Sequence, residues 1–263
     1  MRWIIGDIHG MLRPLETLLR EVQARDARAK FVFVGDYVNR GRESPGVIDR
    51  LLRLDDAVFL RGNHDDIFDL ILNDHSYIGN GEPFDALSAY SAFMNHGLAE
   101  TLTAYGVDYA ELEFLIYHPN LDRLRELVDV VPTAHKEFFR ALRPVAEFET
   151  FFVAHAMWDI DEPDTSPDLI ARMNGDIRLR HQMLWGRYNA QEIMAKKRWQ
   201  RTGYFGHTPV NNYRKDGPLV PIKGPQIVLL DTGAALGPAG RLSAVCADSG
   251  QLVQADRSGM IVS

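Results

Sequence analysis

Residues 2–10 read Arg2-Trp3-Ile4-Ile5-Gly6-Asp7-Ile8-His9-Gly10, a short apolar run that stops at a glycine and two side chains able to bind a metal ion. The run Arg2–Ile5 predicts a β-strand, and the glycine lets the backbone turn sharply after it. An amphipathic pattern over Leu12–Val22 then predicts a helix. Strand, polar turn and helix in this order favour an α/β fold, in which ligands bind beyond the carboxyl ends of the strands.

The same alternation continues after the first helix. Phe31–Val34 and Ala57–Leu60 predict two more strands, and Val47–Leu54 predicts the helix between them. Right-handed crossovers between successive strands imply a mainly parallel sheet. Short apolar runs separated by glycine and proline return in the last third and predict five further strands: Phe151–Ala154, Tyr204–Phe205, Ile227–Leu230, Leu242–Val245 and Gln251–Gln254.

The middle of the chain, about residues 66–149, has a different pattern. Its periodicity is helical, and only Phe114–Tyr117 has the composition of a possible strand. Four helices are predicted there: Leu87–Met94, Leu98–Tyr105, Leu121–Val128 and Lys136–Leu142. Because there is no repeat and no low-complexity linker, we expect residues 1–263 to form one domain with a helical insertion, which would be either a lid or scaffold.

Composition narrows the class of protein. With 46% hydrophobic and 25% charged residues, the chain has enough apolar material for a packed core. The formal charge of −7 argues against a stable nucleic-acid partner, which would need a basic face. A single cysteine, Cys246, excludes an intramolecular disulfide framework, and no apolar run is long enough to span a bilayer. Without a signal-peptide pattern, we expect a cytoplasmic location and no membrane partner.

Five polar fragments each begin where a predicted strand ends. They are Gly6-Asp7-Ile8-His9-Gly10, Gly35-Asp36-Tyr37-Val38-Asn39-Arg40-Gly41, Gly62-Asn63-His64-Asp65, His155-Ala156 and Gly206-His207-Thr208-Pro209. Each fragment alone is more typical of a turn, a helix cap or a structural histidine than of a ligand site. Together they indicate one site, since mixed carboxylate, amide and imidazole donors suit Mn²⁺, Fe or Zn²⁺ at two adjacent positions.

The order of these motifs resembles the calcineurin-like metallophosphoesterases. More narrowly, it resembles their phosphoprotein phosphatase branch, which includes bacterial serine/threonine protein phosphatases and the related symmetrical dinucleoside tetraphosphatases. Leu184-Trp185-Gly186-Arg187 and Leu230-Asp231-Thr232-Gly233-Ala234 also resemble bacterial phosphatase segments, so the likeness spans about Arg2–Val245. The resemblance implies an α/β fold of two facing mixed β-sheets flanked by helices, an αββα sandwich.

The resemblance also implies which residues bind metal. Six side chains would hold two divalent ions, Mn²⁺ first, with Fe or Zn²⁺ as alternatives: Asp7, His9, Asp36, Asn63, His155 and His207. Asp7 and His9 would bind the first ion, and Asp36 would bridge both. Two such ions would supply a bridging hydroxide at neutral pH and neutralise the phosphoryl oxygens.

Other matched residues would act on the substrate. His64 would be the general acid, while Arg40 and Arg187 would hold the phosphate oxygens as planar donors. Pro209 stands where many nucleases and phosphodiesterases of the superfamily have a second histidine, which points away from nucleases.

Asn39 departs from the pattern of the resembled protein phosphatases, which have aspartate here to orient and charge the catalytic histidine. An amide still orients the ring but cannot stabilise its charged form. Weaker proton donation favours leaving groups whose conjugate acid is stronger than a serine hydroxyl. The tetraphosphatase branch also lacks this aspartate. Asp65 or Asp66 would either replace the missing carboxylate or simply open a helix.

The sequence therefore predicts a metal-dependent phosphoesterase acting on a phosphorylated protein or a small phosphorylated molecule. A phosphoprotein phosphatase acting on serine/threonine or tyrosine is the first hypothesis, and a symmetrical dinucleoside tetraphosphate hydrolase is the second. A catalytically weak metal-binding scaffold, suggested only by Asn39, is the third.

Overall fold

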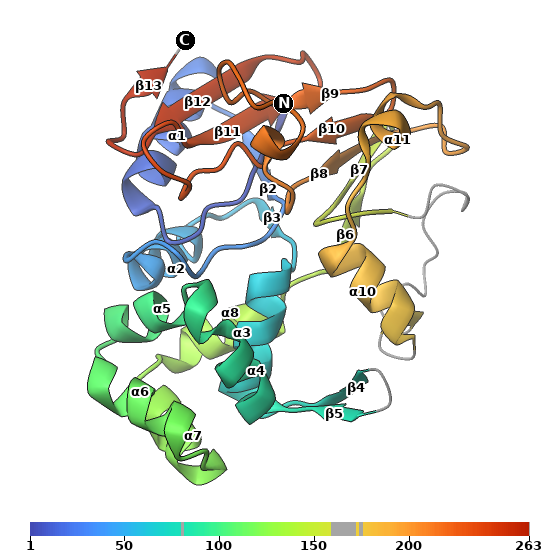
Figure 1. The fold of residues 1–263 in the computed structure, drawn as a ribbon. Helices are drawn as coiled ribbons and strands as arrows, with labels where there is room; N and C mark the ends of the chain where they lie inside the picture. The colour runs from blue at the N-terminus through green and yellow to red at the C-terminus, as the bar shows by residue number, and fades with distance from the viewer. Residues whose placement is uncertain (80–81, 159–171, 174–175, 263) are drawn as a thin grey trace.

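Two β-sheets lie face to face in this computed structural model, which describes residues 1–79, 82–158, 172–173 and 176–262 (Figure 1). The larger sheet contains β1 Arg2–Ile5, β2 Lys30–Phe33, β3 Ala57–Phe59, β11 Arg241–Cys246, β12 Leu252–Asp256 and β13 Ile261–Val262. The smaller contains β6 Val145–Glu147, β7 Phe151–Ala154, β8 Thr202–Phe205, β9 Ile222–Lys223 and β10 Ile227–Leu229. Their strand orders are β13-β12-β11-β1-β2-β3 and β6-β7-β8-β10-β9. The expected αββα sandwich is confirmed.

Alternation of apolar side chains along β1 explains the layers. Ile4 packs with Val153 and Val228 of the other sheet, so it lies in the core between the two sheets. Trp3 and Ile5 point the opposite way, into the core that includes Leu15. Leu15 belongs to α1, Leu12–Arg25, which covers the outer face of the larger sheet. Each face of β1 is therefore buried from Trp3 onward, which is why residues 3–5 are all apolar.

Parallel pairing brings the polar loops to common edges. β1 pairs with β2 and β2 with β3 in parallel, and β7 pairs with β8 in parallel. The helix α2, Ser44–Leu51, connects β2 to β3. The five fragments therefore leave their strands at carboxyl ends, as predicted.

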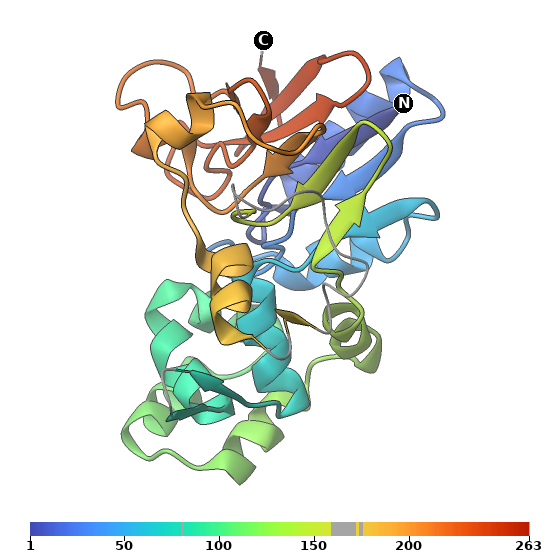
Figure 2. The ribbon, with the colours of Figure 1, turned by 90° about the vertical axis from the view of Figure 1, so that its right-hand side faces the viewer.

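A helical layer occupies the lower half of the molecule in Figures 1 and 2. It contains α3 Asn63–Asn73, α4 Ala86–Phe93, α5 Leu98–Ala104, α6 Tyr109–Tyr117, α7 Leu121–Val128 and α8 Thr133–Arg140. The possible strand at Phe114–Tyr117 was wrong, because this run is the second half of α6, which Asp108 caps by accepting a hydrogen bond from Ala110 N. A hairpin of β4 Tyr77–Gly79 and β5 Glu82–Phe84 also lies here and was not predicted.

Two helices precede the last sheet strands and were not predicted either. They are α10 Ile177–Trp185 and α11 Ala190–Met194. Asp176 and Asn189 cap them by accepting hydrogen bonds from their first-turn N–H groups. Within the described part of the chain, no helix combines the length and apolarity needed to cross a bilayer.

Candidate functional site

The five polar loops follow β1, β2, β3, β7 and β8, and they meet where the carboxyl ends of these strands converge. The backbone N–H of His9 donates to Asp36 O at 2.8 Å, which joins the first loop to the second. The N–H of His207 donates to an Asp7 carboxylate oxygen at 2.9 Å, and Gly206 N donates to His155 O at 2.7 Å. Loops from both sheets are thus joined by direct hydrogen bonds.

The backbone of these loops is strained where the side chains must converge. Six non-glycine residues among those described have φ in the left-handed region, and five of them lie in these loops: His9, Asp36, Asn39, Arg40 and His207. Such conformations cost energy and persist where the surrounding structure enforces them, often at functional sites. The strained residues therefore lie in the same loops as the sequence motifs.

Two loop glycines leave room for carboxylates. A Cβ on Gly62 would lie 2.1 Å from Asp36 Oδ1, and one on Gly206 would lie 2.0 Å from Asp7 Oδ1. Neither distance is compatible with a side chain. The glycines before Asn63 and His207 are therefore required by close approach.

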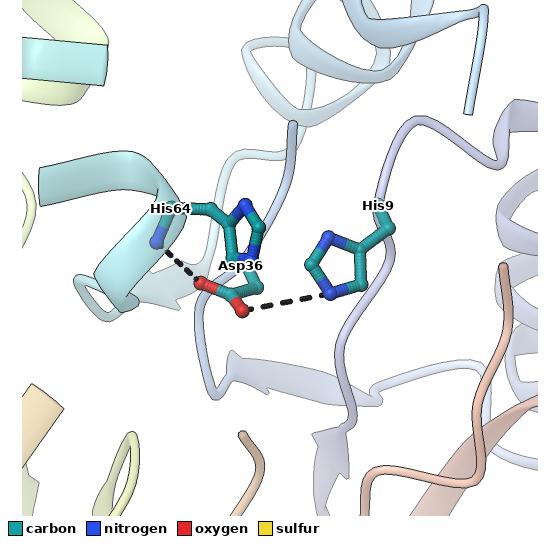
Figure 3. Close-up of side chains that lie close together, drawn as sticks. All are labelled: His9, Asp36 and His64. Atoms are coloured by element: carbon teal, nitrogen blue, oxygen red, sulfur yellow. Dashed lines mark hydrogen bonds and ion pairs between the residues drawn. The ribbon is translucent and has the colours of Figure 1, made fainter. Parts of the chain in front are cut away.

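Asp36 lies at the centre of two groups of potential ligand atoms. The ligand atoms of Asp36, His155 and His207 all lie within 4.8 Å of one another, and so do those of His9, Asp36 and His64. Figure 3 shows His9 and His64 on either side of Asp36, with the His64 backbone N–H 3.0 Å from one carboxylate oxygen and His9 Nε2 3.5 Å from the other. A shared carboxylate between two groups is the arrangement expected for a bridging ligand.

In the group of Asp36, His155 and His207, the His155 ring presents a lone pair to two oxygen atoms. His155 Nδ1 donates to Val34 O at 2.9 Å, so the lone pair of the neutral ring is on Nε2. That Nε2 lies 3.0 Å from Asn63 Oδ1 and 3.5 Å from Asp36 Oδ1. Asn63 Oδ1 is also 2.9 Å from His207 Nδ1. The lone pairs of His155 Nε2, Asn63 Oδ1 and Asp36 Oδ1 repel one another unless a cation lies among them, so these donors fit a metal ion.

The ligand atoms around His9 and Asp36 also include lone pairs that lack a proton donor in the described part of the chain. His9 Nδ1 donates to Val38 O at 2.9 Å, which leaves its Nε2 as a lone pair facing Asp36. His9 Nε2 and Asp7 Oδ1 are buried and have no hydrogen-bond partner among the described residues. Buried polar atoms are normally paired, so these two atoms are also suited to a cation.

Burial shifts the protonation of the site strongly when no cation is present. It raises the pKa of Asp7 and of Asp36 well above the ordinary value, and the charge of Asp231 raises that of Asp7 further. Burial lowers the pKa of His155 to about 3 and that of His207 to about 2. The imidazoles are therefore neutral and ready to coordinate, whereas the two carboxylates hold their protons to a higher pH than usual.

Three further residues with predicted roles lie on the open side of the metal-ligand groups. Arg40, His64 and Arg187 line a pocket of about 320 Å³ together with aromatic side chains that include Phe93 and Trp185. Arg40 Nη2 is 3.4 Å from His64 Nε2. The structure thus brings both arginines and His64 to one cavity beside the ligand groups.

Asn39 is fully buried behind His64, with its Nδ2 2.8 Å from His64 Nδ1. Neither aspartate considered as a replacement contacts the His64 ring. Asp65 accepts hydrogen bonds from backbone N–H groups, and Asp66 forms ion pairs with Arg61 and Arg180. The partner of His64 is therefore an amide.

Sequence reasoning missed four residues at or near the site. His96, which no sequence motif singled out, lines the pocket beside Phe93. Asp231 is buried with Oδ2 unpartnered among the described residues, although its segment was noted. Asp65 and Thr101 support the loops of Asp36 and Asn39. Only Asp231 and Asp65 lay in noticed motifs; nothing in the sequence around Thr101 or His96 marks them.

Two curated relatives are similar to part of this chain. The symmetrical bis(5'-nucleosyl)-tetraphosphatase of Coxiella burnetii is 41% identical over 63 residues, which are 24% of this chain and 22% of that protein. The same enzyme of Bordetella pertussis is 40% identical over 65 residues, 24% of each chain. The matched part is thus about a quarter of these relatives' length.

Solved structures match over nearly the whole chain. A putative diadenosine tetraphosphatase has a TM-score of 0.55 at 23% identity, covering 96% of this chain and 91% of that one. A cold-active protein-tyrosine phosphatase of a psychrophilic Shewanella has a TM-score of 0.52 at 13% identity, covering 99% and 79%. At such identities the likeness is one of fold. The profile of the calcineurin-like phosphoesterases matches residues 2–210, and with the fold and the convergent loops in agreement, the chain belongs to that family.

Proposed function

We propose that this protein is a hydrolase that uses two divalent metal ions to cleave phosphate bonds with acidic leaving groups, and that dinucleoside polyphosphates are its first candidate substrates. The observation that carries this proposal is the 2.8 Å contact between Asn39 Nδ2 and His64 Nδ1. A neutral amide does not stabilise an imidazolium, and burial lowers the pKa of His64 well below its ordinary value. A leaving group that is stable as an anion needs little proton donation.

The assigned residues would have three roles: binding the metal ions, binding the phosphoryl oxygens and facing the leaving group. The six ligands of the two ions would be Asp7, His9, Asp36, Asn63, His155 and His207. When bound, the ions supply a hydroxide nucleophile at neutral pH and neutralise the phosphoryl oxygens; Mn²⁺ is the first candidate. Arg40 and Arg187 would bind the phosphoryl oxygens through their planar guanidinium groups, which match a phosphate better than an ammonium does. His64 would face the leaving oxygen from the pocket wall.

The pocket supports a nucleotide. Its described lining contains two arginines and no carboxylate, so it favours a highly anionic ligand. The rings of Phe93 and Trp185 line its wall with centroids 5.8 Å apart and planes at 75° to each other, so the wall offers aromatic surface against which a base can pack. The curated relatives named above are symmetrical bis(5'-nucleosyl)-tetraphosphatases. These observations support our preference for the second hypothesis from the sequence over the first.

A phosphotyrosine protein is the second candidate substrate. The same aromatic wall would accept a phenyl ring, and a phenol is far more acidic than a serine hydroxyl. Phosphoserine and phosphothreonine come last, because their alkoxides depend most on the proton that a charged histidine would donate.

One parallel assay tests the proposal. The Mn²⁺-loaded protein is given diadenosine tetraphosphate, a phosphotyrosine peptide and a phosphoserine peptide, and kcat/KM is measured for each. We expect the order to follow leaving-group acidity, with two ADP as the products of the first substrate. Fastest turnover of the phosphoserine peptide would overturn the substrate class, and no turnover of any phosphate compound would leave only the metal-binding scaffold.

A further inference from the structure

Two side chains of the pocket wall come from the end of α10. Trp185 is the last residue of this helix, and Arg187 follows two positions later. Both line the pocket, and Arg187 Nη1 lies 3.4 Å from Oγ1 of Thr208, which follows the expected ligand His207. The position of α10 therefore decides where the guanidinium of Arg187 can reach.

The second half of α10 is fixed by buried contacts. Met183 and Leu184 lie in this half and are buried. The carbonyl of Met183 accepts a hydrogen bond of 3.0 Å from the N–H of Ala156. Ala156 follows the expected ligand His155, so this end of the helix is attached to the loop after β7.

An ion pair joins the first half of α10 to α3, and both helices lie in the same region of Figures 1 and 2. Residues 177–180 are exposed or partly exposed, so apolar burial contributes less to the position of this half. Arg180 reaches α3 through its guanidinium: Nη2 donates to Asp66 Oδ1, and Nε donates to Asp66 Oδ2 at 3.3 Å. Two donors of one planar group on two oxygens of one carboxylate fix direction as well as distance.

Asp66 is a firm point of attachment for that arginine. Its side chain is 2% exposed and lies one turn after the expected ligand Asn63 on α3. Arg61 Nη1 also donates to Asp66 Oδ1 at 3.2 Å and to Asp69 Oδ2 at 2.8 Å. A buried ion pair contributes little net stability, because desolvation of both charges offsets their attraction. Its more direct effect is to orient the helix that carries the arginine.

We propose that Arg180 is a positioning residue: its ion pair with Asp66 fixes α10, and the fixed helix holds Arg187 ready to bind a phosphate group. The inference rests on the proposed function and deepens it, because it names what keeps the phosphate-binding arginine in place before the substrate arrives. A guanidinium that is already in place loses less freedom when it binds phosphoryl oxygens. Without the ion pair, Arg187 would have to be ordered at each binding event.

Binding of inorganic phosphate to the Mn²⁺-loaded protein measures this effect, and calorimetric titration gives the Kd. Arg180→Met removes both contacts while Arg61 still neutralises Asp66, and we expect a roughly fivefold higher Kd. Arg180→Lys keeps the charge but lacks the planar pair of donors, so its Kd should lie between those of Arg180→Met and the wild type. Arg178→Met, at an exposed arginine of the same helix, is the matched control and should bind phosphate like the wild type.

A double-mutant cycle tests whether Arg180 acts through Arg187. Arg187→Ala removes the phosphate-binding guanidinium, so adding Arg180→Met to it should raise the Kd for phosphate by less than about twofold. A general loss of structure would instead weaken binding by the same factor in both backgrounds. Equal factors would therefore overturn the proposal.

Tryptophan fluorescence reports the position of α10 in the metal-free protein. Three of the four tryptophans are at most 4% exposed: Trp3, Trp158 and Trp199. Trp185 is partly exposed, so quenching by acrylamide reports mainly on this residue. We expect stronger quenching in Arg180→Met and unchanged quenching in Arg178→Met. Unchanged quenching in Arg180→Met would overturn the proposal.

The outcomes separate this inference from the proposed function. If Arg180→Met does not fold, Arg180→Lys decides, and wild-type phosphate affinity and quenching in that variant would overturn the proposal. If phosphate binding and quenching change as expected but no phosphate compound is hydrolysed, the proposed function alone is contradicted.

Discussion

Asp65 Oδ2 accepts a hydrogen bond of 2.6 Å from the backbone N–H of Asp36. The same carboxylate accepts from Tyr37 N and Gly62 N, both at 2.9 Å. Asp65 therefore links the loop of Asp36 to the start of α3 through these hydrogen bonds. Burial raises the pKa of Asp65 to about 6, while the three N–H groups oppose that rise.

We predict that Asp65→Ala destabilises the fold and weakens metal binding. The substitution leaves three buried N–H groups without their acceptor, which should lower the free energy of unfolding by roughly 3 kcal/mol. Denaturant unfolding of the metal-free protein and Mn²⁺ titration check the two effects. Asp122→Ala, at an exposed carboxylate, is the control and should change stability by less than ~0.5 kcal/mol. Equal stability of the two variants would contradict this role of Asp65.

We predict that Asn39→Asp raises kcat for a phosphoserine peptide by roughly tenfold and changes that for p-nitrophenyl phosphate much less. A carboxylate would stabilise the charged His64 ring and make it a proton donor, which matters for an alkoxide and hardly for a nitrophenolate. Steady-state kinetics on both substrates measure the ratio. Asn120→Asp, the same change at an exposed helix cap, is the control. Equal effects on both substrates would contradict this explanation of Asn39.

We predict that Gly206→Ala lowers the affinity for Mn²⁺ by roughly tenfold or more, because the new methyl group would push Asp7 Oδ1 away from the ligand group. Calorimetric titration of the metal-free protein measures the affinity. Gly217→Ala is the control: its Cβ meets nothing within 4 Å, so only the cost of a positive φ is added there. Unchanged Mn²⁺ affinity in Gly206→Ala would mean that Asp7 is not a ligand.

The strands and their loops were predictable from the sequence because both signals are local. Arg2–Ile5 and Phe151–Ala154 have the predicted bounds, since each is an apolar run that stops at polar residues. Phe114–Tyr117 misled for the same reason: four apolar residues in a row fit a strand, but Asp108 had already started a helix. Short apolar runs do not distinguish the two structures.

The contacts that orient the site were not predictable because they join residues distant in sequence. Thr101 meets Asn39 across 62 positions, and His155 meets Asn63 across 92. Asn63 and His155 could be assigned from motifs, whereas Thr101 belongs to a helix without one. Which helical residue supports a loop depends on how α5 packs, and that packing has no local pattern.

We predict that Mn²⁺ binding at pH 6.5 releases protons, and that they come from carboxylates. Burial raises the pKa of Asp7 and Asp36, so in the metal-free protein these groups keep protons at a pH where ordinary carboxylates are ionised. The ion must displace those protons, so affinity should increase as pH rises through the raised pKa values, up to about tenfold per pH unit for each proton released. His155, with a pKa of about 3, is already neutral and releases none.

Calorimetry in two buffers of different ionisation enthalpy counts the protons. Asp231→Asn should release fewer, because the charge of Asp231 contributes to the raised pKa of Asp7; zero release by the wild type would show that the carboxylates are ionised before the metal binds.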